Sequence, residues 1–241
     1  MSHKLEVKNI KKKIKKTEII KGINLEIGSS EIVGLLGANG AGKTTTFYMI
    51  CGLLALSSGK ILLDGKDITS MPLHKRAKLG IGYLPQESSI FKDLSVEENL
   101  TIAAQIFYKD KEMVNEKIDE MLSLLNIDPI RKRAGVSLSG GERRRCEIAR
   151  ALIAMPNFLL LDEPFAGVDP IAVADIQNIV KDLKNLGIGV LITDHNVRET
   201  LAICDRAYVM KDGQILFSGS SSEVASNADV KKYYLGESFN F

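Results

Sequence analysis

The chain has 241 residues, of which 45% are hydrophobic and 26% charged, a composition typical of a soluble globular protein. Its 32 Lys and Arg residues nearly balance its 30 Asp and Glu residues, and a formal net charge of +2 gives no reason to expect nucleic-acid binding. No apolar run approaches the roughly 20 residues of a membrane-spanning helix, and no apolar segment of a secretion signal follows the basic N-terminus. We therefore expect a chain that neither spans a membrane nor is secreted.

The few cysteines and histidines argue against a disulfide framework or a zinc site. They are widely spaced and form no Cys-x-x-Cys pair and no Cys/His cluster. The reduced cytosol is the compartment that this pattern favours, with the thiols as small buried hydrophobic groups. The residues concerned are Cys51, Cys146, Cys204, His3, His74 and His195.

Strand-like and helix-like segments alternate along most of the chain. Strands are predicted at residues 31–36, 60–63, 81–84, 158–161, 190–193, 206–210 and 214–218. Helical spacing predicts helices at residues 43–53, 96–106, 111–125, 141–153, 171–186 and 197–203. Two of the strands, 158–161 and 190–193, are apolar without interruption, as in parallel strands that are covered on both faces. The alternation predicts an α/β fold with a mostly parallel sheet.

Two regions depart from this alternation. Residues 4–10, 18–27 and 60–63 predict an antiparallel β subdomain, with a turn at Gly65-Lys66. Residues from about 94 to 125 are almost purely helical and predict a second lobe. We expect a single domain over residues 1–241. Within it, residues 1–93 and 155–241 form the core and the antiparallel subdomain, and residues 94–154 form the helical subdomain.

A glycine-rich segment carries the strongest functional pattern. It follows an apolar strand, precedes a helical segment, and reads Gly37-Ala38-Asn39-Gly40-Ala41-Gly42-Lys43-Thr44. The glycines let consecutive backbone N–H groups surround phosphate oxygens at a helix N-terminus. Lys43 can reach the β- and γ-phosphates, and Thr44 can offer its hydroxyl to Mg²⁺. A plain glycine turn is the alternative. The flanking strand and helix favour a P-loop that binds ATP through residues 37–44 and Thr45.

Two acidic residues follow the apolar strand at residues 158–161. Asp162 is placed to hold Mg²⁺, directly or through water. Glu163 is placed to take a proton from an attacking water. The alternative is an ordinary strand end, which the P-loop makes less attractive.

A second candidate phosphate contact lies in the Leu-Ser-Gly-Gly-Glu run at residues 138–142. Ser139 and Glu142 have the spacing of a capping box. Gly140 and Gly141 weaken such a cap but expose N–H groups at a positive helix end, which suits a phosphate. One P-loop cannot reach this cap within the same lobe. The simplest arrangement is a two-fold dimer in which each chain closes the nucleotide site of the other.

Gln86 and His195 each follow a predicted strand. Gln86 could coordinate Mg²⁺, or position water and sense the γ-phosphate. His195 on its own could be an ordinary loop residue. Beyond the carboxyl edge of a parallel sheet, where ligands of open α/β sheets bind, it is predicted to contact the γ-phosphate.

Taken in chain order, these motifs resemble those of the ATP-binding subunits of ABC transporters. Residues 37–44 match the Walker A motif, Gln86 the Q-loop, 138–142 the signature, 158–162 Walker B, Glu163 the catalytic glutamate, 167–170 the D-loop and His195 the H-loop. The resemblance implies the P-loop NTPase (ABC ATPase) fold. It also implies Mg²⁺-dependent hydrolysis of ATP in a head-to-tail homodimer and two transmembrane partner subunits.

Several longer runs are similar to the ATPases of lipopolysaccharide export; they cover residues 44–49, 80–87, 89–91, 162–170, 192–200 and 234–237. That resemblance implies a motor on the cytoplasmic face of the inner membrane, which drives lipopolysaccharide from that membrane toward the cell surface. Its transmembrane partners are expected to dock near residues 86–94. The alternatives are the ATPase of a branched-chain amino-acid importer and a soluble non-transport ABC ATPase. A non-hydrolysing regulatory subunit and a small P-loop kinase are disfavoured by Glu163 and by the signature.

Ile14 departs from the ABC pattern, in which an aromatic residue ahead of Walker A stacks on adenine. The sequence thus leaves open what contacts the adenine. The basic run around Ile14 is most simply a solvated hairpin turn. The alternatives are contact with nucleotide phosphate or with anionic lipid head groups. The run consists of Lys8, Lys11, Lys12, Lys13, Lys15 and Lys16.

Overall fold

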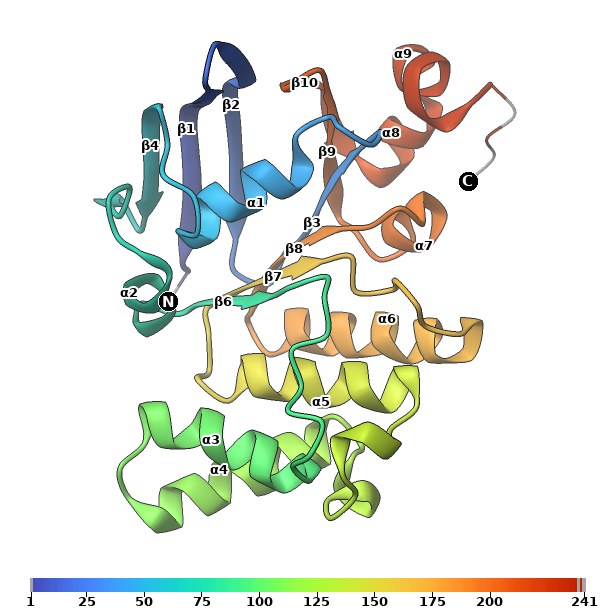
Figure 1. Cartoon of the computed structure of the whole chain (residues 1–241). Coiled ribbons are helices and arrows are strands. Elements are labelled where there is room, and N and C mark those ends of the chain that lie inside the picture. Colours follow the sequence, from blue (N-terminus) through green and yellow to red (C-terminus); the bar gives the residue numbers. More distant parts are fainter. Residues whose placement is uncertain (1, 238, 240–241) are drawn as a thin grey trace.

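A six-stranded sheet forms the centre of the computed structural model, which describes residues 2–237 and 239 (Figure 1). Its strand order is β10-β9-β3-β8-β7-β6. Neighbouring strands are parallel except at the edge, where β10 runs antiparallel to β9. The strands are β3 (Ile32–Gly37), β6 (Ile81–Leu84), β7 (Phe158–Asp162), β8 (Gly189–Thr193), β9 (Arg206–Lys211) and β10 (Gln214–Ser220). β3, β7 and β8 are buried along their whole length, as their uninterrupted apolar sequences predict.

A four-stranded antiparallel sheet of order β2-β1-β4-β5 packs beside the central sheet. Its strands are β1 (Lys4–Ile14), β2 (Thr17–Gly28), β4 (Ser58–Leu63) and β5 (Lys66–Asp67). The predicted turn at Gly65-Lys66 is wrong by one residue, because Lys66 already pairs with Leu63 in the ladder. The loop is Asp64-Gly65, and both residues have positive φ (51° and 76°), the backbone that an Asp-Gly hairpin loop accommodates.

Helices fill the space between the two sheets and cover the other face of the central sheet (Figure 1). α1 (Lys43–Cys51) lies between the sheets, and α5 (Gly140–Leu152) and α6 (Pro170–Asn185) lie on the opposite face. α3 (Val96–Phe107) and α4 (Lys111–Leu124) form the layer beyond α5. The remaining turns are α2 (Leu73–Lys78), α7 (Val197–Leu201), α8 (Ser221–Ser226), α9 (Ala228–Val230), η1 (Asp128–Ile130), η2 (Gly135–Ser137) and η3 (Lys231–Leu235). Among the helices described, none is both long enough and apolar enough to cross a membrane.

Two hydrophobic clusters hold these layers together. One lies between the sheets and contains Phe47 of α1 and Phe158 of β7, both fully buried. The other extends from Leu159 of β7 through Ile148 of α5 to Leu100 of α3. Because the second cluster is continuous, the α3–α4 layer shares its core with the central sheet.

Candidate nucleotide site

Five of the predicted site residues lie at one edge of the central sheet. β6, β7 and β8 are parallel neighbours, so residues that follow their carboxyl ends meet at the same edge. β3 ends at this edge too and leads into the P-loop. The residues that the topology gathers there are Lys43, Gln86, Asp162, Glu163 and His195.

Glycines allow the P-loop to turn tightly between β3 and α1. Gly37 has a φ of +148°, and a Cβ atom there would lie 2.4 Å from the carbonyl oxygen of Met210. Gly42 has a φ of +104°, and its Cβ would lie 2.5 Å from the side chain of Ile20. Gly42 is also the N-cap of α1 and brings no side chain to the first turn of the helix. Backbone N–H groups there remain available to an anion, as P-loop binding of phosphate requires.

Lys43 is buried inside the loop. Its Nζ donates hydrogen bonds to the carbonyl oxygens of Gly37 (2.8 Å) and Ala38 (3.2 Å). Burial lowers the pKa of Lys43, and the nearby charges of Glu163 and Asp162 oppose that effect. The ammonium group is thus held beside two carboxylates, at the point where a nucleotide's phosphates would enter.

Asp162 is only 1% exposed. Burial first, and then the charge of Glu163, raise its pKa to about 6, while a hydrogen bond from Tyr83 and the charge of Lys43 oppose the rise. The Tyr83 hydroxyl lies 3.4 Å from Oδ2, and Oδ1 has no hydrogen-bond partner among the described residues. A buried carboxylate oxygen without a partner is the group that a bound cation would satisfy.

These surroundings fit Mg²⁺ rather than a metal held by protein ligands alone. In residues 2–237 and 239, no group of three or more His, Cys, Asp or Glu side chains could hold an ion. Mg²⁺ usually takes one or two carboxylates and completes its shell with water and substrate phosphates. Asp162 and the exposed Thr44 at the start of α1 match that requirement.

Glu163 lies at the centre of the polar contacts at this edge. His195 Nε2 is 2.7 Å from Oε1, and Gln86 Nε2 donates to Oε2 over 2.6 Å. The Glu163 backbone has a φ of +48°, an unusual conformation for a residue with a side chain. Its N–H group donates to the carbonyl oxygen of Thr193 on β8. Gln86 and His195, which lie 77 and 32 positions from Glu163 in the sequence, therefore both contact its carboxylate. The Gln86 amide donates to Glu163 and not to Asp162.

The signature residues lie elsewhere. Ser139 caps α5 in a reciprocal capping box with Glu142, as the sequence predicts. Ser139 N donates to Glu142 (2.8 Å), whose pKa this bond lowers, and Arg133 pairs with the same carboxylate at 2.7 Å. Figure 1 shows α5 on the opposite face of the central sheet from α1, the helix that the P-loop leads into. Within one chain, Gly140 and Gly141 therefore do not join the P-loop.

Ile14 lies at the end of β1, where it pairs with Thr17 across the β1–β2 hairpin, and it is 48% exposed. Some lysines of the basic run around Ile14 have partners within the chain. Lys12 donates to the carbonyl oxygen of Ala55 (2.6 Å), and Lys8 pairs with Glu6 (3.1 Å).

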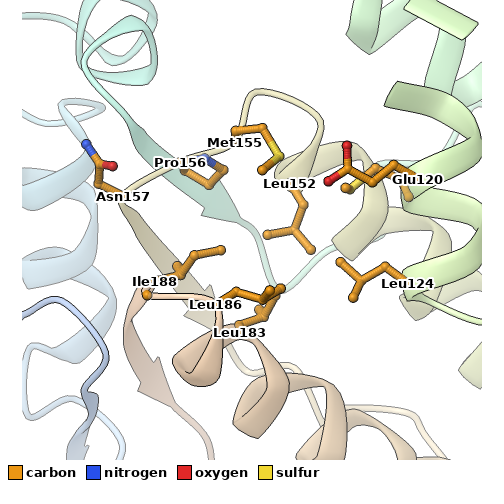
Figure 2. Close-up of a pocket in the computed structure, with 11 residues that line it drawn as sticks. Glu120, Leu124, Leu152, Met155, Pro156, Asn157, Leu183, Leu186 and Ile188 are labelled. Atoms are coloured by element: carbon orange, nitrogen blue, oxygen red, sulfur yellow. The ribbon is translucent and has the colours of Figure 1, made fainter. Parts of the chain in front are cut away.

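An apolar hollow of about 240 Å³ occupies the other edge of the sheet, between α4, α5 and α6 (Figure 2). Leu152, Met155, Leu183, Leu186 and Ile188 face it, and none of the predicted site residues lines it. Ligands of open α/β sheets bind at the carboxyl ends of the strands, so this hollow is not the candidate active site.

Sequence reasoning missed Arg144 and Glu147. Both lie on α5 and are buried, although each stands in a strongly polar stretch, Glu142 to Glu147. Arg144 contacts the backbone of both Asp162 and Glu163. The available signal was that helical spacing places both residues one turn apart on a face with apolar neighbours.

Comparison with known proteins agrees with this geometry. The family model described as ABC transporter matches residues 20–166, more than half of the chain. The chain belongs to the ATP-binding subunits of ABC transporters. Its fold matches a crystal structure described as the ADP conformation of an ATP-binding cassette of an ABC transporter, with 31% identity, a TM-score of 0.89 and coverage of 98% of this chain and 99% of that one. The predicted P-loop NTPase fold and ATPase class are therefore confirmed.

Several relatives carry a more particular name. The chain is 55% identical over 237 residues to the lipopolysaccharide export system ATP-binding protein LptB of Haemophilus influenzae, and the match covers 98% of both chains. It is 52% identical over 238 residues to the protein of that name from Escherichia coli, again over 98% of both. The one from Acidithiobacillus ferridurans is 48% identical over 99% of both chains.

Proposed function

We propose that this chain is the ATP-hydrolysing motor of a lipopolysaccharide exporter. The observation that carries the hydrolytic part is the cluster of Lys43, Asp162 and Glu163 at one sheet edge, with Gln86 and His195 on the Glu163 carboxylate. The substrate rests on the relatives named for lipopolysaccharide export, which are similar over nearly the full length of both chains. Branched-chain amino-acid import and a soluble non-transport role remain the competing functions.

ATP is held mainly by its phosphates in this proposal. The backbone of Gly37, Ala38, Asn39, Gly40, Ala41 and Gly42, with the side chains of Lys43, Thr44 and Thr45, surrounds them. Lys43 exchanges its two loop carbonyls for phosphate oxygens. Thr44 and Asp162 would hold Mg²⁺, with Gln86 nearby, and a bound ion would neutralise phosphate charge.

Glu163 acts as the general base. Its carboxylate accepts a proton from the attacking water. His195 and Gln86 hold both carboxylate oxygens, so the base is pre-oriented before water arrives. His195, which is half-exposed, then faces the γ-phosphate and stabilises its charge.

A second copy of the chain completes the site. Ser139, Gly140, Gly141 and Glu142 begin a helix that faces away from the P-loop of their own chain, and in a head-to-tail homodimer that helix end would reach the partner's nucleotide (Figure 1). A more distant cassette of the same fold, 24% identical, is described as dimeric in a post-hydrolysis state with ADP and phosphate.

Two transmembrane subunits dock near residues 86–94, on the cytoplasmic face of the inner membrane. Phe91 is 45% exposed in this loop, and the Arg150 guanidinium lies 4.9 Å from the centre of its ring. This exposure means that the Phe91 ring is not part of the buried core of the helical lobe. Beside it, a cavity of about 200 Å³ is lined by Leu73, Tyr83, Phe107 and Arg150, which suits an amphipathic partner helix. No nucleic-acid partner is expected.

The test is reconstitution of the chain with its organism's transmembrane subunits in vesicles that contain lipopolysaccharide. ATP-dependent release of lipopolysaccharide to a soluble acceptor is the expected result, and Lys43→Ala abolishes it. A complex that hydrolyses ATP but moves no lipopolysaccharide would overturn the assignment of the substrate and leave the assignment as an ATPase unchanged. If the chain hydrolyses ATP but joins no membrane subunit, a soluble role is favoured instead.

A further inference from the structure

A buried ion pair lies between the loop that follows β6 and the strand end that carries the catalytic carboxylates. Arg144 and Glu147 are one turn apart on α5, and their side chains are 6% and 3% exposed. Nη1 of Arg144 lies 3.0 Å from Oε2 of Glu147. Neither residue belongs to the P-loop, the signature glycines or the catalytic cluster.

The other oxygen of Glu147 holds the loop. Oε1 accepts hydrogen bonds from the Ser88 hydroxyl (2.7 Å) and from the Ser89 backbone N–H (3.0 Å). These residues lie between Gln86, which contacts Glu163, and Phe91, which we assign to the docking surface. Glu147 therefore contacts the loop at its midpoint, on the chain segment that connects docking to catalysis.

Arg144 holds the catalytic strand end through its backbone. Its Nη2 donates to the carbonyl oxygens of Asp162 and Glu163, each at 3.2 Å, and its Nε donates to Pro164 at the same distance. Nη1 also donates to Pro85, just before Gln86. All five N–H groups that a guanidinium offers can thus be used within this one site.

The held backbone is the strained part of the site. Glu163 has a φ of +48°, a conformation that persists only where surrounding contacts impose it. Three consecutive carbonyls of that turn are bound by one buried guanidinium, whose own position depends on Glu147. A displacement of the Ser88–Ser89 segment consequently reaches the Glu163 turn through only two side chains.

We propose that Glu147 is a positioning residue that couples the loop at residues 86–91 to the orientation of Glu163; the proposal rests on the catalytic role assigned to Glu163 above. An anchoring role for the α5 helix alone does not require this arrangement. A well-packed apolar pair anchors a helix without the desolvation cost of buried charges. An apolar pair could not form hydrogen bonds with the docking loop on one side and with the catalytic carbonyls on the other, as Glu147 and Arg144 do.

The test compares Ser88→Ala with Ser123→Ala in the purified full chain. Ser88 is exposed, so its substitution removes one of the two hydrogen bonds that the loop donates to Oε1 of Glu147, without a cavity. We expect kcat for ATP to fall about fivefold, the rate equivalent of one net hydrogen bond, with KM unchanged and the melting temperature lowered by only about 2–4 °C. Ser123 is an exposed serine of α4, and its alanine variant should match the wild type.

A double-mutant cycle adds a second readout. Glu147→Gln should lower kcat at least as much as Ser88→Ala, and the double variant should fall no further, because both changes remove the same link. The proposal is overturned if Ser88→Ala behaves like Ser123→Ala, or if the two effects multiply. Glu163→Gln is assayed in parallel: full activity there would overturn the catalytic assignment itself, whereas an inactive Glu163→Gln beside a normal Ser88→Ala would overturn only the coupling.

Discussion

The Glu163 carboxylate lies 2.7 Å from Nε2 of His195, and both residues follow the ends of neighbouring parallel strands. The opposite oxygen accepts from Gln86 at 2.6 Å, so both oxygens are held in one geometry. A carboxylate fixed in this way, yet beside a buried ammonium group, is suited to remove a proton from water rather than to bind the phosphate itself.

The first prediction therefore concerns Glu163→Gln. The P-loop is untouched, so ATP binding should persist, while hydrolysis should slow by roughly 10²-fold or more, the scale of a lost general base. Since the closed dimer would then outlast its normal lifetime, the variant should elute as an ATP-dependent dimer in size-exclusion chromatography. Glu116→Gln, on the exposed face of α4, is the matched control and should leave the rate unchanged. Near-normal turnover in Glu163→Gln would remove the residue from this role.

Asp162 gives a prediction about stability. Its folded-state pKa of about 6 lies above the ordinary 3.8, so the native state disfavours the ionised form. The folded protein therefore binds more protons than the unfolded chain between these values, and the group's contribution to stability falls as pH rises toward 6. Above pH 6 the penalty is complete, up to about 3 kcal/mol, and it disappears below about pH 4.

Asp162→Asn should consequently raise the melting temperature at pH 7.5, and the gain should shrink at pH 5, although ATPase activity is lost. Thermal unfolding of the wild type and the variant at both pH values measures this difference. Asp182→Asn, an exposed change on α6, is the control and should show no pH-dependent gain. An Asp162→Asn variant that is less stable than the wild type at pH 7.5 would show that the carboxylate is not a buried unpaired charge.

The docking loop gives the third prediction. Phe91→Ala should weaken association with the transmembrane subunits more than it lowers ATP affinity, because the ring is exposed and distant in sequence from the P-loop. Met113→Ala, which removes a comparably exposed side chain on α4, is the control. Pull-down of the complex and nucleotide titration measure the two effects. Equal complex yield from Phe91→Ala and wild type would count against docking at this surface.

Much of this site is predictable because its parts are local. The P-loop, the acids after residue 161, and Gln86 and His195 each follow a strand that its apolar run identifies, and parallel strands end together. The Glu163–His195 and Glu163–Gln86 contacts depend on strand order, with β7 between β6 and β8, which no local pattern contains. Arg144 shows another limit: helical spacing places it on a face with apolar neighbours, but in a run of three arginines the packed structure decides which one is buried.

The last prediction concerns Ile14 and the nucleobase. A base stacked on an aromatic ring gains on the order of 1–3 kcal/mol, a scale taken from nucleic-acid binding, and an aliphatic side chain offers no π-face. Ile14 is 48% exposed at the β1–β2 hairpin, so it can contact a ligand, but much of that gain should be missing. This chain should therefore bind ATP more weakly than a homologue with Tyr at this position, and should distinguish ATP from GTP poorly.

Ile14→Tyr should tighten ATP binding several-fold and leave the pH dependence of turnover unchanged, whereas Ile14→Leu, the aliphatic control, should leave the affinity as it is. A fluorescent-nucleotide titration with ATP and GTP as competitors measures both. If Ile14→Tyr and wild type bind ATP equally, then Ile14 does not lie over the base or another residue stacks on it. Phe47 is fully buried and cannot be that residue. Tyr48 is 38% exposed and packs edge-on against Tyr83, so it is the aromatic to substitute next.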